Sequence, residues 1–295
     1  MALPRVFILF ALSALVLSCG ANVSVWAADE AATARGAYLA AAGDCDGCHT
    51  DKKAGTPALA GGRALATRFG SFYGPNITPD PKTGIGTWSE ADFRRALREG
   101  KNDAGHYLYP VFPFTAFTGM TDADIADLYA FLMSRKPVER SSHAQEAKFP
   151  LGWRFLLLGW RSLFFTAGPL QPVAGQSVEW NRGRYLAEAV AHCQECHTPR
   201  NFLGGLDRAH AYAGNPHGAD GNAAPDITSD KKQGLGDWKL DDIAEVLKSG
   251  MTPDGDYVGQ GMADVVDGTA KLTDADRHAI AVYIQSLAPL PQTPK

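Results

Sequence analysis

Apolar residues recur every three or four positions in several parts of this chain, a pattern that is typical of helices with one buried face. Ser89, Thr121 and Thr273 each precede an aspartate by three positions and are expected helix starts, whereas Gly100 and Gly250 are expected helix ends. Between the helical segments the chain is rich in Gly, Pro and Asn. We therefore predict an all-α fold with long loops, with helices at residues 35–42, 89–99, 121–132, 182–191, 237–249 and 273–287.

The helical segments form two sets with similar sequences. The matching pieces are residues 35–40 with 182–187, residues 75–88 with 225–238, and Thr-Asp-Ala-Asp at 121–124 with 273–276. The separation between matching residues stays at about 150 throughout, with small increases that loop insertions between equivalent helices explain. The chain is therefore expected to be an internal duplication, with two copies of one structural unit.

The duplication predicts two domains, at residues 30–137 and 179–290, joined by a linker at residues 138–178. The centre of the linker, residues 151–165, is strongly apolar, but Arg154 and Arg161 interrupt it. It is also shorter than the about 20 residues that span a membrane. Two interpretations fit this segment: a helix buried between the domains, or a surface for a membrane or a partner protein.

The N-terminal segment 1–27 has the features of a secretory signal peptide. Arg5 precedes an apolar run of about twelve residues, and small residues lead to Ala27 before an acidic stretch begins. We expect cleavage after Ala27 and export of the mature chain. The alternatives are a retained N-terminal anchor and a lipoprotein signal with Cys19 as the acylated residue.

The composition excludes two broad classes. Hydrophobic residues make up 45% of the chain, which is enough to bury a core and argues against disorder. The formal net charge is -4, and no run of Lys or Arg is longer than two residues. Nucleic-acid binding therefore has little support.

Five cysteines are present, and Cys19 lies in the expected signal peptide. The other four form two C-x-x-C-H motifs, at residues 45–49 and 193–197. Two thiols at this spacing can each add to one vinyl group of a haem, and the following imidazole then reaches the iron. A disulfide within each pair, or one zinc site shared by both pairs, would leave both histidines without a role. We predict two covalently bound haem c groups, attached through Cys45, Cys48, Cys193 and Cys196, with His49 and His197 as iron ligands.

Each half resembles a class I cytochrome c, and the whole chain is similar to the multihaem cytochrome c subunits of bacterial periplasmic alcohol, gluconate and related dehydrogenases. The most specific matching pieces are residues 75–88, Met-Ala-Asp-Val-Val from Met262, and Leu-Thr-Asp before the last helix. Many members carry three haem domains and a C-terminal anchor, whereas this chain shows two haem motifs and no apolar tail before Lys295. The resemblance implies two tandem class I cytochrome c domains joined by an apolar linker segment.

The family's sixth iron ligand comes from the loop before the last helix. In the second half this position holds Met262, which the resemblance identifies as the ligand, although a methionine also packs well in a core. In the first half the family pattern of Met-Pro is replaced by Phe112-Pro113. Three interpretations remain for the first haem: ligation by Met120, ligation by His106, or an iron with no protein ligand behind Phe112.

The resemblance implies a periplasmic dihaem cytochrome c of a respiratory chain, which takes electrons from a dehydrogenase and passes them to an oxidase, quinone or another cytochrome. Peripheral membrane contact is compatible with the apolar linker. The main alternative is a dihaem peroxidase or small-oxyanion oxidoreductase that uses an open first haem, and a gas sensor is a third. No catalytic acid or base stands out near Phe112. We therefore expect an electron-transfer protein, or the cytochrome subunit of a dehydrogenase, with no catalytic residue of its own.

Overall fold

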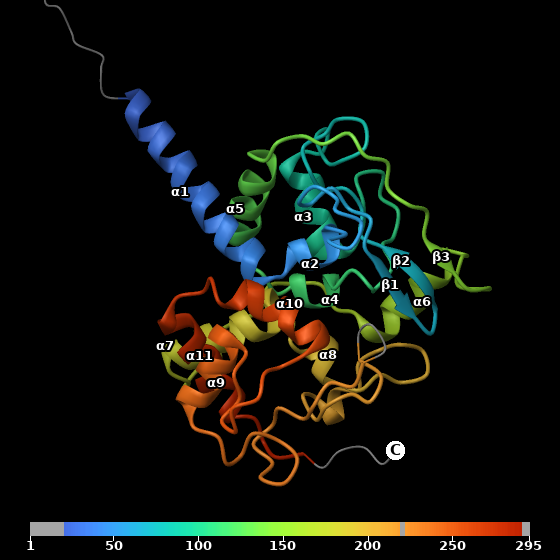
Figure 1. Cartoon of the computed structure of the whole chain (residues 1–295). Coiled ribbons are helices and arrows are strands. Elements are labelled where there is room, and N and C mark those ends of the chain that lie inside the picture. Colours follow the sequence, from blue (N-terminus) through green and yellow to red (C-terminus); the bar gives the residue numbers. More distant parts are fainter. Residues whose placement is uncertain (1–20, 219–221, 291–295) are drawn as a thin grey trace, which may run out of the picture.

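The computed structural model describes residues 21–218 and 222–290, and the chain is mostly helical (Figure 1). The first 20 residues of the expected signal peptide lie outside the described residues. Helix α1 passes through the expected cleavage point after Ala27. The elements of the first half are α1 (Ala21–Ala42), α2 (Cys45–His49), β1 (Ala64–Thr67), β2 (Gly70–Tyr73), α3 (Glu90–Glu99), α4 (Phe114–Phe117) and α5 (Asp122–Met133).

The second half repeats the helices of the first. Its elements are α7 (Val178–Tyr185), the π-helical turn η1 (Leu186–Val190), α8 (Gln194–His197), the 3-10 turn η2 (Arg208–His210), α9 (Leu240–Ser249), α10 (Gln260–Thr269) and α11 (Asp274–Gln285). The predicted starts at Ser89, Thr121 and Thr273 and the predicted ends at Gly100 and Gly250 are confirmed, whereas α7 begins at Val178 rather than at 182 and α9 at Leu240 rather than at 237. The Ser89 hydroxyl accepts a hydrogen bond from the Asp92 amide, and Thr121 and Thr273 cap α5 and α11 in the same way.

A small antiparallel sheet in the first half is a correction to the all-α prediction. β1 pairs with β2, and β2 pairs with β3 (Glu146–Ala147), which belongs to the linker. The backbone of Gly70 has a φ of 135°, which glycine tolerates at the turn between the first two strands. Strands this short leave too few residues for an alternating pattern to be recognised in the sequence.

In each half the first helix crosses the last helix at a glycine. A Cβ atom on Gly36 would lie 2.0 Å from the carbonyl oxygen of Asp127, and one on Gly183 would lie 1.8 Å from that of Ala279. The two glycines occupy equivalent places in the repeated sequence, Arg-Gly-x-Tyr. Direct backbone contact at both crossings therefore requires a residue without a side chain.

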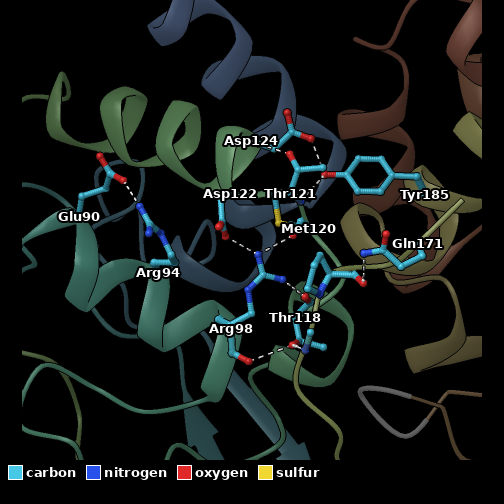
Figure 2. Close-up of polar contacts among 12 residues, drawn as sticks. Glu90, Arg94, Arg98, Thr118, Met120, Thr121, Asp122, Asp124, Gln171 and Tyr185 are labelled. Carbon is cyan, nitrogen blue, oxygen red and sulfur yellow. Dashed lines mark hydrogen bonds and ion pairs between the residues drawn. The ribbon is translucent and has the colours of Figure 1, made fainter.

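The two halves hold one another through a reciprocal pair of tyrosines. The Tyr38 hydroxyl of the first half donates to Asp276 at 2.6 Å and accepts from the Thr273 amide at 3.1 Å. The equivalent Tyr185 of the second half donates to Asp124 and accepts from the amide of Thr121 at 3.1 Å. Figure 2 shows Tyr185 reaching across to the start of α5. Each tyrosine thus ties the first turn of the other half's last helix.

The apolar linker forms helix α6 (Leu156–Phe164), which touches both halves but is not buried between them. Its inner face packs Trp160 near Phe114 of the first half, and the Trp160 indole donates to the carbonyl of Leu203 in the second half at 3.0 Å. Leu158 and Leu163 on its other face are 58% and 68% exposed. The interpretation as a buried helix is therefore wrong, because among the described residues only one side of α6 finds a partner.

Candidate functional sites

The first C-x-x-C-H motif forms α2, a single helical turn that the preceding residue sets in place. Asp44 adopts a left-handed conformation with a φ of 46°, and its carboxylate accepts from the Gly47 amide at 3.1 Å. The His49 ring donates from Nδ1 to the carbonyl oxygen of Pro75 at 2.7 Å. This bond fixes the tautomer and leaves Nε2 as the ring nitrogen with a free lone pair, as an iron ligand requires.

The second motif has the same geometry. Its cysteines lie at the start and within α8, directly after His192, which has a left-handed φ of 43°. The His197 ring donates from Nδ1 to the carbonyl oxygen of Pro225 at 2.8 Å. Burial lowers the pKa of both His49 and His197, although hydrogen bonds to the proline carbonyls raise it in part. Both rings are therefore held as neutral imidazoles.

The thiols of the two motifs do not converge on one metal. In the described part of the chain, no three His, Cys, Asp or Glu side chains form a group that could hold a metal ion. Burial raises the pKa of Cys45 and of Cys193 to about 12. This arrangement argues against the shared zinc site. It fits two separate haem groups, each with two thiols and one oriented imidazole.

The loops that follow the motifs are also built alike. The hydroxyl of Thr50 accepts from the Leu59 amide at 2.8 Å, and that of Thr198 accepts from the Tyr212 amide at 3.0 Å. Leu59 and Tyr212 both have positive φ values, 62° and 66°, which residues with side chains seldom adopt. The matching hydrogen bonds and the matching positive φ values show that the two loops have the same backbone conformation at these positions.

Met262 and Phe112 occupy equivalent places in the two halves. The amide of Leu108 donates to the carbonyl of Gly100 at 2.8 Å, and the amide of Val258 donates to that of Gly250 at 2.9 Å. Phe112 and Met262 follow these paired residues at the same distance along the chain. Met262 lies in the first turn of α10 and is half-buried against the core. The first half thus carries a phenyl ring where the second carries a thioether.

The two other candidates for the first site lie in different surroundings. Met120 is 1% exposed and packs at the start of α5, where Leu272 packs at the start of α11. The guanidinium of Arg98 donates to the Met120 carbonyl at 2.7 Å and pairs with Asp122, as Figure 2 shows. His106 is exposed in a turn that the side chain of Asn102 closes at 2.8 Å.

Sequence reasoning missed the residues that stand directly before each motif. Asp44 faces the second half, and burial, together with the charge of Asp264, raises its pKa to about 7. His192 faces the first half, where its ring meets that of Phe117 edge-on at 5.4 Å. Burial lowers the pKa of His192. The shared position immediately before the first cysteine was the signal that could have identified both residues.

Comparison with known proteins agrees with this geometry. Residues 33–136 match the family model described as cytochrome c. The chain is 44% identical over 255 residues to a diheme cytochrome c-type protein of Cereibacter sphaeroides, and the match covers 85% of this chain and 84% of that protein. It is 42% identical over 271 residues to a nicotinate dehydrogenase subunit of Pseudomonas putida, but covers only 22% of that protein.

The gluconate 2-dehydrogenase cytochrome c subunit of Pantoea cypripedii is 39% identical over 269 residues, which are 88% of this chain and 60% of that subunit. The chain thus spans less than two thirds of these two dehydrogenase subunits. Within the described residues, none of the helices combines the length and apolar character needed to cross a bilayer.

Proposed function

Because this chain belongs to the c-type cytochromes, with a dihaem protein among its relatives, we propose that it carries two haem c groups and transfers electrons between a dehydrogenase and a respiratory acceptor. The dehydrogenase subunits among its relatives support a dehydrogenase as donor. The export signal in the sequence supports a periplasmic location. The acceptor would be an oxidase, a quinone or another cytochrome.

One observation carries the proposal: each motif histidine is oriented by a proline carbonyl. A bound haem supplies an iron that takes up and releases one electron. The chain's own residues attach and orient that group. Cys45 and Cys48 would hold the first haem, with Cys193 and Cys196 holding the second. His49, His197 and Met262 would be the iron ligands.

The first site is proposed to lack a side-chain ligand opposite His49. The phenyl ring at Phe112 cannot donate a lone pair, and it packs against Phe117 at 5.5 Å. Phe117 in turn packs against His192, so the position is fixed by aromatic contacts. This geometry favours a closed electron-transfer site over the peroxidase or oxyanion-reducing alternative. Binding of carbon monoxide by the ferrous holoprotein distinguishes the two functions, since a closed first site should bind it slowly or not at all.

Replacing Met262 by alanine is expected to remove the near-infrared absorption band that a methionine-ligated ferric haem shows, and to lower the potential of one haem, because the thioether favours the reduced iron. Met251→Ala is the matched control, since Met251 is 39% exposed and lies outside α10. A band that persists unchanged in Met262→Ala would refute the ligand assignment. Phe112→Met should conversely add a second band of this kind.

The donor is proposed to dock on the exposed apolar surface of the linker, here called the linker patch: Phe149, Trp153, Phe155, Leu158 and Leu163. Phe149 is 82% exposed, Trp153 53% and Phe155 68%, and the ring of Trp153 packs against those of Phe149 and Phe155. No acidic residue occurs from position 148 to position 178, while three basic ones do. Exposed aromatic clusters of this kind mark binding surfaces for other proteins.

The double change Trp153→Ala with Phe155→Ala is expected to slow reduction of the haems by the donor dehydrogenase by about ten-fold or more, the effect of losing an aromatic anchor. Haem content and potentials should stay unchanged. Val178→Ala, at an apolar residue of α7 that is 88% exposed, is the control and should have no effect. Equal reduction rates in variant and parent would rule out the linker patch as the donor site. If the double variant instead loses binding to anionic lipid vesicles, the linker patch is a membrane-binding surface.

A further inference from the structure

In each half, the segment around the sixth-ligand position contacts the other half. It packs against the helix that leads into the other half's haem motif. A Cβ atom on Gly268, at the end of α10, would lie 2.2 Å from the carbonyl oxygen of Ala41 in α1. One on Gly119, just beyond α4, would lie 2.9 Å from Cβ of Ala189 in η1. Figure 1 shows α10 at the junction of the halves, by the end of α1. Met262 is therefore carried by a helix that rests on the first half.

A single arginine of the first half connects this helix to the first haem motif. Nη1 of Arg63 donates to the carbonyl oxygen of Gly47, inside the motif, at 2.6 Å. The same nitrogen donates to the Asp264 carboxylate at 2.9 Å, across a sequence separation of 201 residues. Asp264 lies on α10, on the turn that also carries Met262. The guanidinium thus bridges the backbone around the first haem and the helix that serves the second.

The first turn of α10 has no side-chain cap. Its N-cap residue is Gly259, and no atom of the described residues stands within 4 Å of a Cβ position there. Helices α5 and α11, by contrast, begin with threonine caps. Because no side chain caps this first turn, contacts that α10 makes with other elements have a larger share in fixing it.

The charges around the bridge favour its formation. The side chains of Arg63 and Asp264 are 25% and 31% exposed, so solvent screens their attraction less than that of a fully exposed pair. Lys52 adds contacts with Asp264 at 3.6 Å and Asp267 at 3.3 Å, but its side chain is 49% exposed. Asp44 faces the same cluster from the first half.

We propose that Arg63 is a positioning residue for the second haem: through Asp264 it holds α10 so that the thioether of Met262 stays at the iron. The first half thereby sets the ligation of the second half. The inference rests on the proposed function, in which Met262 is the ligand. It adds that this ligation depends on a side chain from the other repeat, which neither half could supply alone.

Asp264→Asn in the full holoprotein is the sharpest test, since it removes the negative charge that pairs α10 with Arg63 and leaves the bond between Arg63 and Gly47 in place. The ferric protein is titrated with imidazole while the near-infrared band of the methionine-ligated haem is followed. We expect the band to be lost at an about five-fold lower imidazole concentration, because the methionine-dissociated form is more populated. Arg63→Gln should shift the titration in the same direction, Arg63→Lys should restore part of it, and the double variant should shift no further than either single one.

Lys82→Gln is the control for lost surface charge, since its pair with Glu139 is 70% and 62% exposed and lies away from the junction. Two haems per chain and an unchanged far-ultraviolet spectrum show that each variant has folded. An imidazole titration of Asp264→Asn that matches the parent would overturn the inference. Met262→Ala distinguishes failure of this inference from failure of the proposed function. If Met262→Ala keeps the band, the assignment of Met262 as ligand is wrong. If Met262→Ala loses the band while Asp264→Asn matches the parent, only the role of Arg63 is refuted and the proposed function stands.

Discussion

Replacing Cys193 and Cys196 together by alanine is expected to reduce the covalently bound haem from two groups per chain to one. The thioether bonds form only at these thiols, and without them only coordination by His197 and Met262 would hold the second haem. The first motif should keep its haem, since α2 takes its shape from Asp44 and Gly47 within the first half. Pyridine haemochrome absorbance and the mass of the intact chain both measure the outcome.

The reciprocal change at Cys45 and Cys48 is the matched control, and it should leave the haem of the second motif. Absorption in the near-infrared separates the two products, because only the chain that keeps the second motif holds the haem that Met262 would ligate. A chain that still binds two haems after either double change would contradict the assignment of the motifs. Loss of both haems from either variant would instead show that the two sites cannot mature separately.

Replacing Gly183 by alanine is expected to destabilise the fold by about 3 kcal/mol or more, and so to lower the melting temperature by roughly 6–12 °C. The added Cβ would lie 1.8 Å from the carbonyl oxygen of Ala279 and 2.4 Å from its carbonyl carbon. Both are backbone atoms of α11, so no flexible side chain can move aside. The two helices must separate, and the buried contacts between them are lost.

Gly159→Ala is the control for the same chemical change. Gly159 also lies within a helix, α6, but no atom of the described residues stands within 4 Å of its Cβ position. Alanine has the higher helix propensity, so this variant should be neutral or more stable by up to about 1 kcal/mol. Thermal and urea unfolding of both holoproteins measure the difference. Equal stability of Gly183→Ala and the parent would show that the crossing is not as tight as the structure has it.

The helices were predictable because their signals are local. Ser89, Thr121 and Thr273 cap the first turns that follow them, and the apolar spacing in each segment selects the buried face. The C-x-x-C-H motifs are equally local, since covalent chemistry demands that spacing whatever surrounds it. The strands could not be predicted in the same way. β3 is two residues long and exists only because the linker returns to pair with β2.

The position of the apolar linker segment could not be predicted from the sequence either. The spacing of its residues predicts a helix, but it cannot say whether one face or both will find partners. The structure places the indole of Trp160 between Phe114 and Leu203, contributed by different halves, and leaves Trp153 and Phe155 exposed. Burial of a helix depends on where distant elements meet. The local pattern carries no information about these distant elements, so the interpretation as a buried helix was wrong.

By itself, the sequence determined the duplication, the two haem motifs and the exchange of methionine for phenylalanine at position 112, since each of these is written in neighbouring residues. Only the tertiary structure decided how the two copies depend on one another. Tyr38 and Tyr185 each tie the other half's last helix, and Arg63 connects the first motif with Asp264. Such contacts join residues far apart in the chain. The strength of these contacts depends on the distance between the two partners and on how deeply they are buried. Both are set only when the two halves fold against each other.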